Sequence, residues 1–261
     1  MHGGTPSNLP RPRPGEHRTE ANRARDGFRH PIETLTFFGV TPTSSVVEVW
    51  PGGGWYTEIL APYLRTGGVY FAAGFAMTLA DAPEFFSNAQ RALANKLASN
   101  AVYDHVVLTE LSAPERAVMA PPGSADFVLT FRNVHNWFAR GNADAMMAAF
   151  NRALKPGGVL GIVEHRAKPG TADEVMKKSG YMTEQYVIDL AAKHGFTLAA
   201  RSEINANAKD STDHPAGVWT LPPNLRHCQP MADGPDKSAC IATYTAIGES
   251  DRMTLKFVKA G

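Results

Sequence analysis

One stretch of the chain, FRNVHNWF, gathers several side chains that could take part in catalysis. His135 can act as a general base near neutral pH, and Arg132 can hold an anionic group. Asn133 can orient a bound molecule, and Trp137 can form the wall of a pocket. His165 ends the later stretch VLGIVEH and could join them. These residue types favour a site that binds a small polar molecule and moves a proton.

A second candidate site is the glycine-rich stretch EVWPGGGWY. Glycine lets the backbone approach a ligand closely, and a helix that follows offers unpaired N–H groups. The carboxylate at the start of the stretch could order the loop or accept a hydrogen bond from a cationic group. We expect this stretch to bind a cofactor through Glu48, Trp50, Pro51, Gly52, Gly53, Gly54 and Tyr56.

Both stretches belong to an alternating pattern of strands and helices. β-Branched and apolar runs predict strands at 44–50, 67–73, 104–110, 126–131, 159–165, 195–204, 242–248 and 252–259. Helical spacing predicts two short helices within 20–39 and longer ones at 55–64, 85–97, 142–154 and 183–194. Strands that alternate with helices in this way indicate an α/β protein with a doubly wound, mostly parallel sheet, whose last strand is an antiparallel edge.

In open α/β sheets, ligands bind beyond the carboxyl ends of the strands. The glycine-rich stretch follows the first predicted strand and FRNVHNWF follows the fourth, so we expect the two to share one edge. Residues 205–240 are rich in Asn, Pro, Asp and Gly and are too long for a simple connection. We therefore expect this insertion to form a lid or rim over the site, with His214 and Trp219 facing it.

The overall composition excludes several classes of partner. Lys and Arg number 26 against 25 Asp and Glu, which leaves no basic surplus for a nucleic-acid binder. No apolar run approaches the length of about 20 residues that a membrane-spanning helix needs. With 43% hydrophobic residues, the chain can build an ordinary core, and a small molecule is the expected partner.

The ends of the chain and its cysteines add further expectations. Residues 1–26 are polar and rich in Pro and Arg, which predicts a flexible arm before a single domain over 27–261. Cys228 and Cys240 are the only cysteines, and either a disulfide formed in an oxidising compartment or two separate thiols would suit them. His227 lies beside Cys228 without the CxxC or HxxxH spacing of zinc ligands, so no metal site is predicted.

These stretches together resemble the class I S-adenosyl-L-methionine (AdoMet)-dependent methyltransferases, over about residues 44–204 and again at 252–258. EVWPGGG resembles the acidic and glycine-rich first motif of that fold, and LKPGGVLGIVEH resembles its turn into the fifth strand. More narrowly, EVWPGGGWYTEILAPYL, FRNVHNW, SGYMTEQYVIDLAAKHGF and GESDRMTLKFVK resemble a group of bacterial predicted methyltransferases. Leader peptides in that group imply a periplasmic or exported mature protein, whereas the printed N-terminus read literally implies a cytoplasmic one.

The resemblance implies a seven-stranded sheet with AdoMet as cofactor, its methionine end held by Gly52–Gly54. His135 would then deprotonate an O, N or S acceptor that Arg132, Asn133 and His165 orient. The sequence departs from the family pattern at two places. Trp50 replaces the first glycine of the motif. The second strand offers Ala72 and Ala73 where the family has an acid for the ribose hydroxyls, a role that Glu84 could take over.

Two other functions remain open from the sequence. These departures suit an exported ligand-binding protein that kept the fold without catalysis. A lyase or hydrolase could use Arg132, His135 and His165, although no Gly-x-Ser-x-Gly nucleophile motif accompanies them. The sequence does not identify the acceptor molecule or the oligomeric state.

Overall fold

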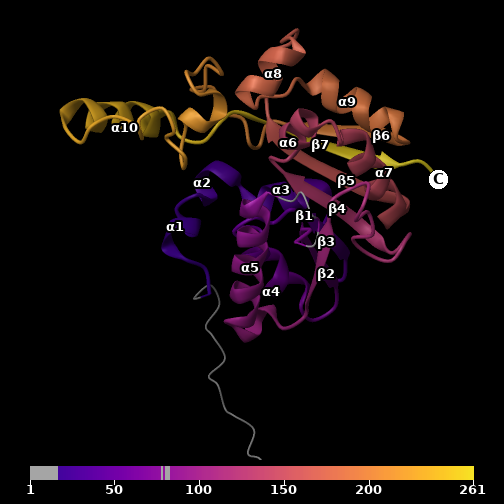
Figure 1. Cartoon of the computed structure of the whole chain (residues 1–261). Coiled ribbons are helices and arrows are strands. Elements are labelled where there is room, and N and C mark those ends of the chain that lie inside the picture. The colour runs from indigo at the N-terminus through magenta and orange to yellow at the C-terminus, as the bar shows by residue number, and fades with distance from the viewer. Residues whose placement is uncertain (1–16, 78, 80–82) are drawn as a thin grey trace, which may run out of the picture.

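The computed structural model describes residues 17–77, 79 and 83–261, so the first 16 residues of the predicted N-terminal arm lie outside it (Figure 1). Its centre is a seven-stranded sheet with the order β3-β2-β1-β4-β5-β7-β6. The strands are β1 (Ser45–Val49), β2 (Val69–Phe75), β3 (Val106–Leu111), β4 (Ala125–Phe131), β5 (Leu154–His165), β6 (Phe196–Ser202) and β7 (Arg252–Lys259). β1 to β5 pair in parallel, and β7 is antiparallel to both neighbours. This arrangement confirms the predicted fold class, but the prediction that the last strand is an edge was wrong, because β7 lies between β5 and β6.

Helices cover both faces of the sheet. The α-helices of the described residues are α1 (Glu20–Arg23), α2 (Asp26–Arg29), α3 (Pro31–Phe38), α4 (Thr57–Leu64), α5 (Glu84–Ala98), α6 (Val134–Arg140), α7 (Ala143–Ala153), α8 (Asp173–Ser179), α9 (Glu184–Lys193) and α10 (Pro235–Ile247), the last of which points away from the sheet (Figure 1). Successive side chains of a strand point to opposite faces, so Val46 packs with α3 and α4, whereas Val47 belongs to the core formed with α7 and α9. The two cores hold the sheet's carboxyl ends in fixed positions.

The first described residues pack on the domain, although the sequence predicted a flexible arm over 1–26. Trp55 donates its indole N–H to the carbonyl of Asn22 at 2.9 Å. Arg25 forms an ion pair with Glu249 at 2.5 Å. The segment that contains α1 and α2 therefore lies against the glycine-rich stretch, and residues 20–39 form three short helices instead of two.

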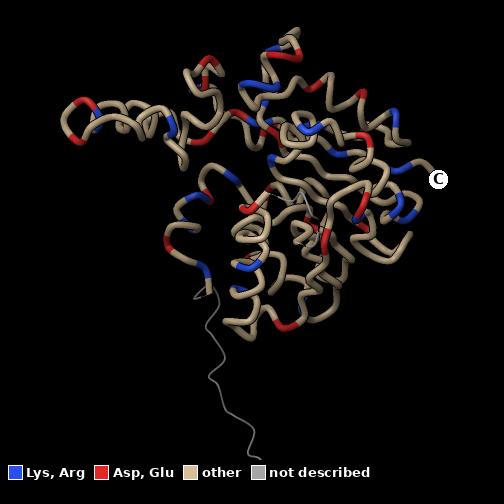
Figure 2. Tube along the Cα trace, viewed as in Figure 1, with Lys and Arg blue, Asp and Glu red and all other residues tan. Residues whose placement is uncertain are grey.

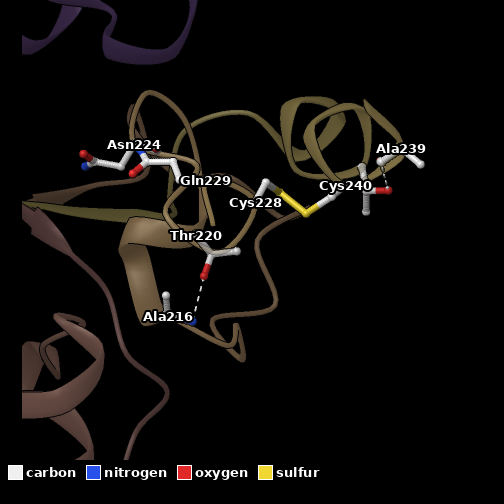
Figure 3. The surroundings of a disulfide bond; sticks show 8 residues. Ala216, Thr220, Asn224, Cys228, Gln229, Ala239 and Cys240 are labelled. Atoms are coloured by element: carbon white, nitrogen blue, oxygen red, sulfur yellow. Dashed lines mark hydrogen bonds between the residues drawn. A yellow bond between two sulfur atoms is a disulfide. The ribbon is translucent and has the colours of Figure 1, made fainter. Parts of the chain in front are cut away.

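The prediction of a strand at 242–248 is wrong. Those residues lie at the end of α10, whose residues are all at least partly exposed and which projects from the body of the molecule (Figure 1). Pro235 at its first turn favours a helix start, and β7 already has a strand on each side, so the sheet has no free edge there. A disulfide between Cys228 and Cys240 ties this helix to the preceding loop (Figure 3).

Two properties of the described residues bear on the predicted partners, namely the lengths of the helices and the distribution of charge. No helix in the described part of the chain is both long and apolar enough to cross a bilayer. Basic and acidic residues are interspersed along the trace (Figure 2), as the net charge of +1 leads one to expect.

Candidate active site

The strand order reverses between β1 and β4, which is where α/β sheets bind their ligands. The residue after β1 is Trp50 and the residue after β4 is Arg132. Both have left-handed backbone conformations, with φ of 48° and 63°. Such values are uncommon for residues other than glycine and cluster at functional sites. Two cavities open beside these residues.

The first, which we call the glycine-loop cavity, has a volume of about 250 Å³. It is lined by Asn22, Arg25, Arg29, Glu48, Val49, Trp50, Pro51, Gly52, Gly53, Trp55, Tyr56, Phe75, Phe131, Arg132 and Asn133. A Cβ atom added to Gly52 or Gly53 would meet nothing within 4 Å, so the loop backbone faces open space. Gly54 differs, because its backbone packs on Leu93 and Lys96 of α5. All the other predicted cofactor residues line this cavity.

Glu48 lies in β1 and links the elements on either side of the glycine-rich loop. Its carboxylate accepts hydrogen bonds from Thr57, the first residue of α4, and from the hydroxyl of Tyr70 in β2. Burial raises the pKa of Glu48 to about 7, against the opposing effect of these two hydrogen bonds. The side chain therefore joins the helix that follows the loop to the neighbouring strand.

Trp50 keeps the backbone conformation that glycine adopts freely at this point of the motif. Its indole N–H donates to the carbonyl of Leu111 at the end of β3, at 2.8 Å. The ring packs against Phe75, Phe86 and Trp137, with centroids 4.8 to 5.8 Å apart. Aromatic side chains therefore fill the space beside the ends of β2 and β3.

This aromatic cluster corrects one prediction. Trp137, which the sequence placed in a pocket wall, is fully buried beneath Trp50 and lines neither cavity. Ala72 and Ala73 are buried within β2, and Glu84 is exposed at the start of α5, outside the cavity lining. No carboxylate among the described residues at the end of β2 lines the glycine-loop cavity.

Sequence analysis missed Arg25, Arg29 and Glu249. Arg29 is only 3% exposed and pairs with Glu249 at 3.1 Å. The Nη2 atoms of Arg25 and Arg29 are buried without a hydrogen-bond partner in the described structure. Because Glu249 lies more than 200 residues away along the chain, no local pattern could have connected the three.

The second cavity, the histidine cavity, also has a volume of about 250 Å³. It is lined by Arg132, His135, Asn136, His165, Val218, Trp219, Pro222, Pro223, Asn224, Glu249 and Ser250. Five of these residues come from the predicted 205–240 insertion, which therefore contributes to the rim of this cavity. Trp219 belongs to that rim, but His214 does not: its ring pairs with Asp210 at 2.8 Å, outside the lining.

His135 stands at the first turn of α6 and is held by Glu164 from the end of β5. Its Nδ1 lies 2.9 Å from Glu164 Oε1. The backbone N–H groups of Val134, His135 and His165 also donate to this carboxylate. Since Glu164 acts only as an acceptor, Nδ1 carries the proton, and Nε2 is left as the basic nitrogen of His135.

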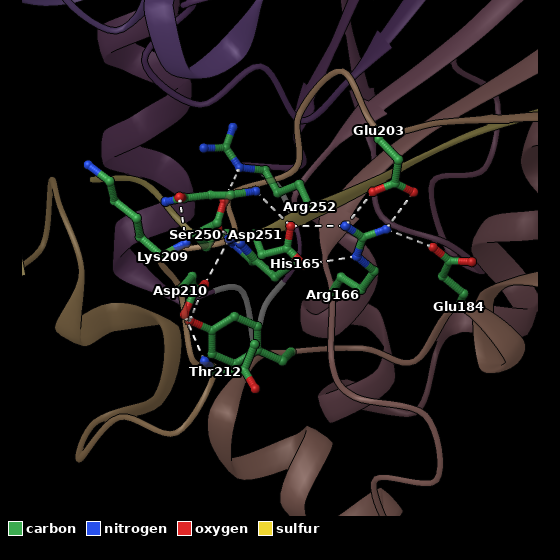
Figure 4. Close-up of polar contacts among 12 residues, drawn as sticks. His165, Arg166, Glu184, Glu203, Lys209, Asp210, Thr212, Ser250, Asp251 and Arg252 are labelled. Atoms are coloured by element: carbon green, nitrogen blue, oxygen red, sulfur yellow. Dashed lines mark hydrogen bonds and ion pairs between the residues drawn. The ribbon is translucent and has the colours of Figure 1, made fainter. Parts of the chain in front are cut away.

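His165 lies beside His135, with ring centroids 5.2 Å apart. Its Nδ1 is 2.6 Å from the hydroxyl of Ser250 (Figure 4). Burial, reinforced by the charges of neighbouring cationic groups, lowers the pKa of His165 well below its ordinary value. The next residue, Arg166, pairs with Asp251 at 2.9 Å and so fixes the end of β5 against the start of β7.

Arg132 lines both cavities and therefore lies between them. Burial, with a smaller contribution from Arg252, lowers its pKa to about 10, so the guanidinium stays charged at neutral pH. Asn133 lies on the glycine-loop side, where its amide donates to the carbonyl of Val49 at 3.0 Å. The structure thus brings Arg132, His135 and His165 together, with Asn133 behind them.

One group of side chains has the composition of a metal site, although the sequence predicted none. Ligand atoms of His135, Glu164 and His165 lie within 4.8 Å of one another. Both Glu164 oxygens already accept backbone hydrogen bonds, and the charged Arg132 borders the same cavity. This positive surrounding disfavours a divalent cation and favours an anion.

Comparison with known proteins identifies the fold. No family model and no curated protein matches this chain. Among solved structures, it is similar to a SAM-dependent methyltransferase from Aquifex aeolicus (20% identity, TM-score 0.52, covering 70% of this chain and 87% of that one). It is also similar to a putative sarcosine dimethylglycine methyltransferase from Galdieria sulphuraria (14% identity, TM-score 0.59, covering 93% of this chain and 90% of that one). A third similar structure is the [4+2]-cyclase SpnF (14% identity, TM-score 0.58, covering 95% of this chain and 85% of that one). The chain has the Rossmann-like class I methyltransferase fold.

Proposed function

We propose that this protein transfers the methyl group of AdoMet to a small molecule bound in the histidine cavity. One observation carries the proposal: Arg132 separates a cavity at a glycine loop from a cavity lined by His135, whose ring the buried Glu164 orients. A cofactor and an acceptor could therefore lie on either side of one residue. The methyltransferases among the structural neighbours support the same reaction.

The glycine-loop cavity fits the amino-acid end of AdoMet. Open space before Gly52 and Gly53 allows a ligand to contact the loop backbone. The unpartnered Nη2 atoms of Arg25 and Arg29 are the donors that a carboxylate needs. An ammonium group would find its acceptors among the loop carbonyl groups.

The bound cofactor would supply an electrophilic methyl group on its sulfonium. The protein's part is to hold the acceptor in line with that group and to keep water away, since geometry and desolvation control this kind of step. His135 Nε2 would accept the proton that the acceptor loses, and Glu164 would stabilise the resulting imidazolium. His165 would remain neutral and orient the acceptor.

Calorimetry with AdoMet and its demethylated product, S-adenosylhomocysteine, tests the cofactor. A matched pair of variants locates the binding. Gly53→Leu puts a side chain into open space at the cavity, whereas Gly27→Leu puts one into open space at an exposed position of α2. We expect the first to weaken AdoMet binding at least tenfold and the second to leave it unchanged. Failure of the wild-type protein to bind either compound would refute the proposal.

A second candidate is a ligand-binding protein without catalytic activity. Trp50 favours it, because the indole fills space beside the glycine loop that a larger ligand could otherwise use. Tight binding of S-adenosylhomocysteine would leave this candidate without support. Co-purification of a different small molecule, detected by native mass spectrometry, would favour it.

We also propose that the mature protein is exported. The Cys228–Cys240 disulfide supports this, because structural disulfides are typical of oxidising compartments. Fractionation of a cell that makes the full-length precursor, with alkylation of free thiols before lysis, is the test. Protein found in the cytoplasm with both thiols alkylated would contradict the export.

A further inference from the structure

The charged side chains around the two cavities do not balance. Three arginines line them, Arg25, Arg29 and Arg132, against two carboxylates, Glu48 and Glu249. Taking charges out of water is costly unless they are paired. The surplus of positive charge is therefore a property of the site that needs an explanation.

The groups behind the lining do not remove the surplus. Arg252 adds a fourth positive charge and pairs with Glu249 at 2.6 Å, while Glu164 adds a negative charge behind His135. Four guanidinium groups thus face at most three carboxylates. Because burial raises the pKa of Glu48 to about 7, that carboxyl is uncharged in part of the molecules at neutral pH.

The ion pairs of Glu249 also indicate a surplus of positive charge. Glu249 is the common partner of Arg25, Arg29 and Arg252, and their pull, with that of Arg132, outweighs burial and lowers its pKa to about 2. Its two oxygens are therefore already shared among three guanidinium groups. Arg132 donates to no other side chain among the described residues, although it borders both cavities.

AdoMet itself would not supply the missing negative charge. Its carboxylate is offset by its ammonium group, and its sulfonium adds a further positive charge. If the proposed cofactor occupies the glycine-loop cavity, the positive surplus at Arg132 grows. The compensating charge must then come from the other ligand.

We infer that the molecule bound in the histidine cavity carries an anionic group, a carboxylate or a phosphate, which Arg132 holds. As an acceptor class, this inference rests on the proposed methyl transfer, whereas the anion site itself does not. Arg132 can offer a planar pair of donors to either group, and the neutral His165 and the amides of Asn136 and Asn224 can complete its coordination. An anionic group at Arg132 also lies in the cavity of His135, the proposed base.

The test measures binding of four probes to the intact purified protein at constant ionic strength. Inorganic phosphate and benzoate represent the two anions, and benzamide and benzylamine are the neutral and cationic counterparts of benzoate. We expect one or both anions to bind and the counterparts not to. The preferred anion distinguishes phosphate from carboxylate.

Three variants test whether Arg132 is the residue that binds the anion. Arg132→Gln should weaken binding of the preferred anion about 10- to 100-fold, and Arg132→Lys should recover part of that loss. Arg65→Gln removes the same charge at an exposed ion pair with Asp104 and should change nothing. Circular dichroism of each variant excludes unfolding as the cause.

The outcomes separate this inference from the proposed function. Anion binding that depends on Arg132 supports the inference even where calorimetry finds no AdoMet binding. Equal binding of benzoate and benzamide, no binding of either anion, or anion binding that Arg132→Gln leaves intact would overturn it. If the protein binds AdoMet but neither anion, the proposed cofactor is supported and the inferred anionic acceptor is refuted.

Discussion

The carboxyl ends of the first five strands form one edge of the sheet, but its two halves are built differently. At β1, β4 and β5, charged and polar side chains surround two cavities. At β2 and β3, Trp50, Phe75 and Phe86 pack against one another and fill the space. The polar half of the edge therefore contains both cavities, and the aromatic half is packed solid except where Trp50 and Phe75 line the glycine-loop cavity. The variants below test that division.

The largest effect is expected at the proposed base. His135→Ala should lower the turnover number of methyl transfer by about 10²- to 10⁴-fold and leave the AdoMet dissociation constant within about twofold. His194→Ala is the control, because that histidine pairs with Asp144 on the surface of the domain. Similar losses in turnover and in AdoMet affinity would show that His135 is structural.

Substitutions in the aromatic half should lower the free energy of unfolding. Trp50→Ala should lower the free energy of unfolding by about 3–5 kcal/mol, because it empties space at the centre of the cluster. Phe85→Ala, at a side chain that is 55% exposed, should cost less than about 1 kcal/mol. Urea unfolding of both variants measures the difference. Equal small losses would mean that the cluster does not support the fold.

Two carboxylates that line the cavities should show opposite pH effects. The pKa of Glu48 is raised to about 7, so its stabilising contribution is present below its unfolded pKa near 4.5 and is lost as the pH rises through 7. Glu48→Gln should remove about 3 kcal/mol of this decline between pH 4.5 and 7. The measurement is the free energy of unfolding at several pH values.

Glu249 provides the matched variant. Its pKa is lowered to about 2, so its contribution is present above pH 4.5 and is lost as the pH falls toward 2. Glu249→Gln should therefore flatten the acid side of the stability profile and leave the slope between pH 4.5 and 7 unchanged. The same change of slope in both variants would contradict the assignment.

The smallest effect on overall stability is expected at the disulfide. A bridge over a loop of this length contributes about 3 kcal/mol in the chain-entropy model, but α10 contains no buried residue and can unfold locally. Cys240→Ser should thus shift global unfolding by less than that amount while it speeds proteolysis within 229–247. A large loss of global stability would show that α10 is coupled to the rim of the histidine cavity.

The sequence predicted the sheet well because its strands are buried and strongly patterned. β4 and β5 are apolar runs that a central parallel sheet requires, and Thr183 caps α9 as expected. The prediction from the sequence pattern was wrong in a segment whose side chains are not buried in a core. Residues 242–248 alternate like a strand, but α10 has no buried residue, so no core selected one structure over the other there.

At the site, local patterns indicated residues near the ends of their own strands and missed those that come together across the fold. Glu48 lies in β1, and Gly52, Arg132 and His135 lie shortly after β1 or β4, so a strand pattern was enough to place them at this edge of the sheet. Glu249 pairs with Arg25 and Arg29, which lie more than 200 residues away along the chain, so no local pattern indicated that it belongs to the site. For Trp137 the prediction was wrong in the opposite way. An indole suits a pocket wall, but the side chain of Trp137 on α6 is fully buried in the core.

The link between Arg25 and Glu249 joins the first described helices to the residues just before β7. During synthesis, Arg25 and Arg29 emerge from the ribosome more than 200 residues before their acidic partner Glu249. The glycine-loop cavity can therefore acquire this ion-paired wall only after both segments have been synthesised and have come together.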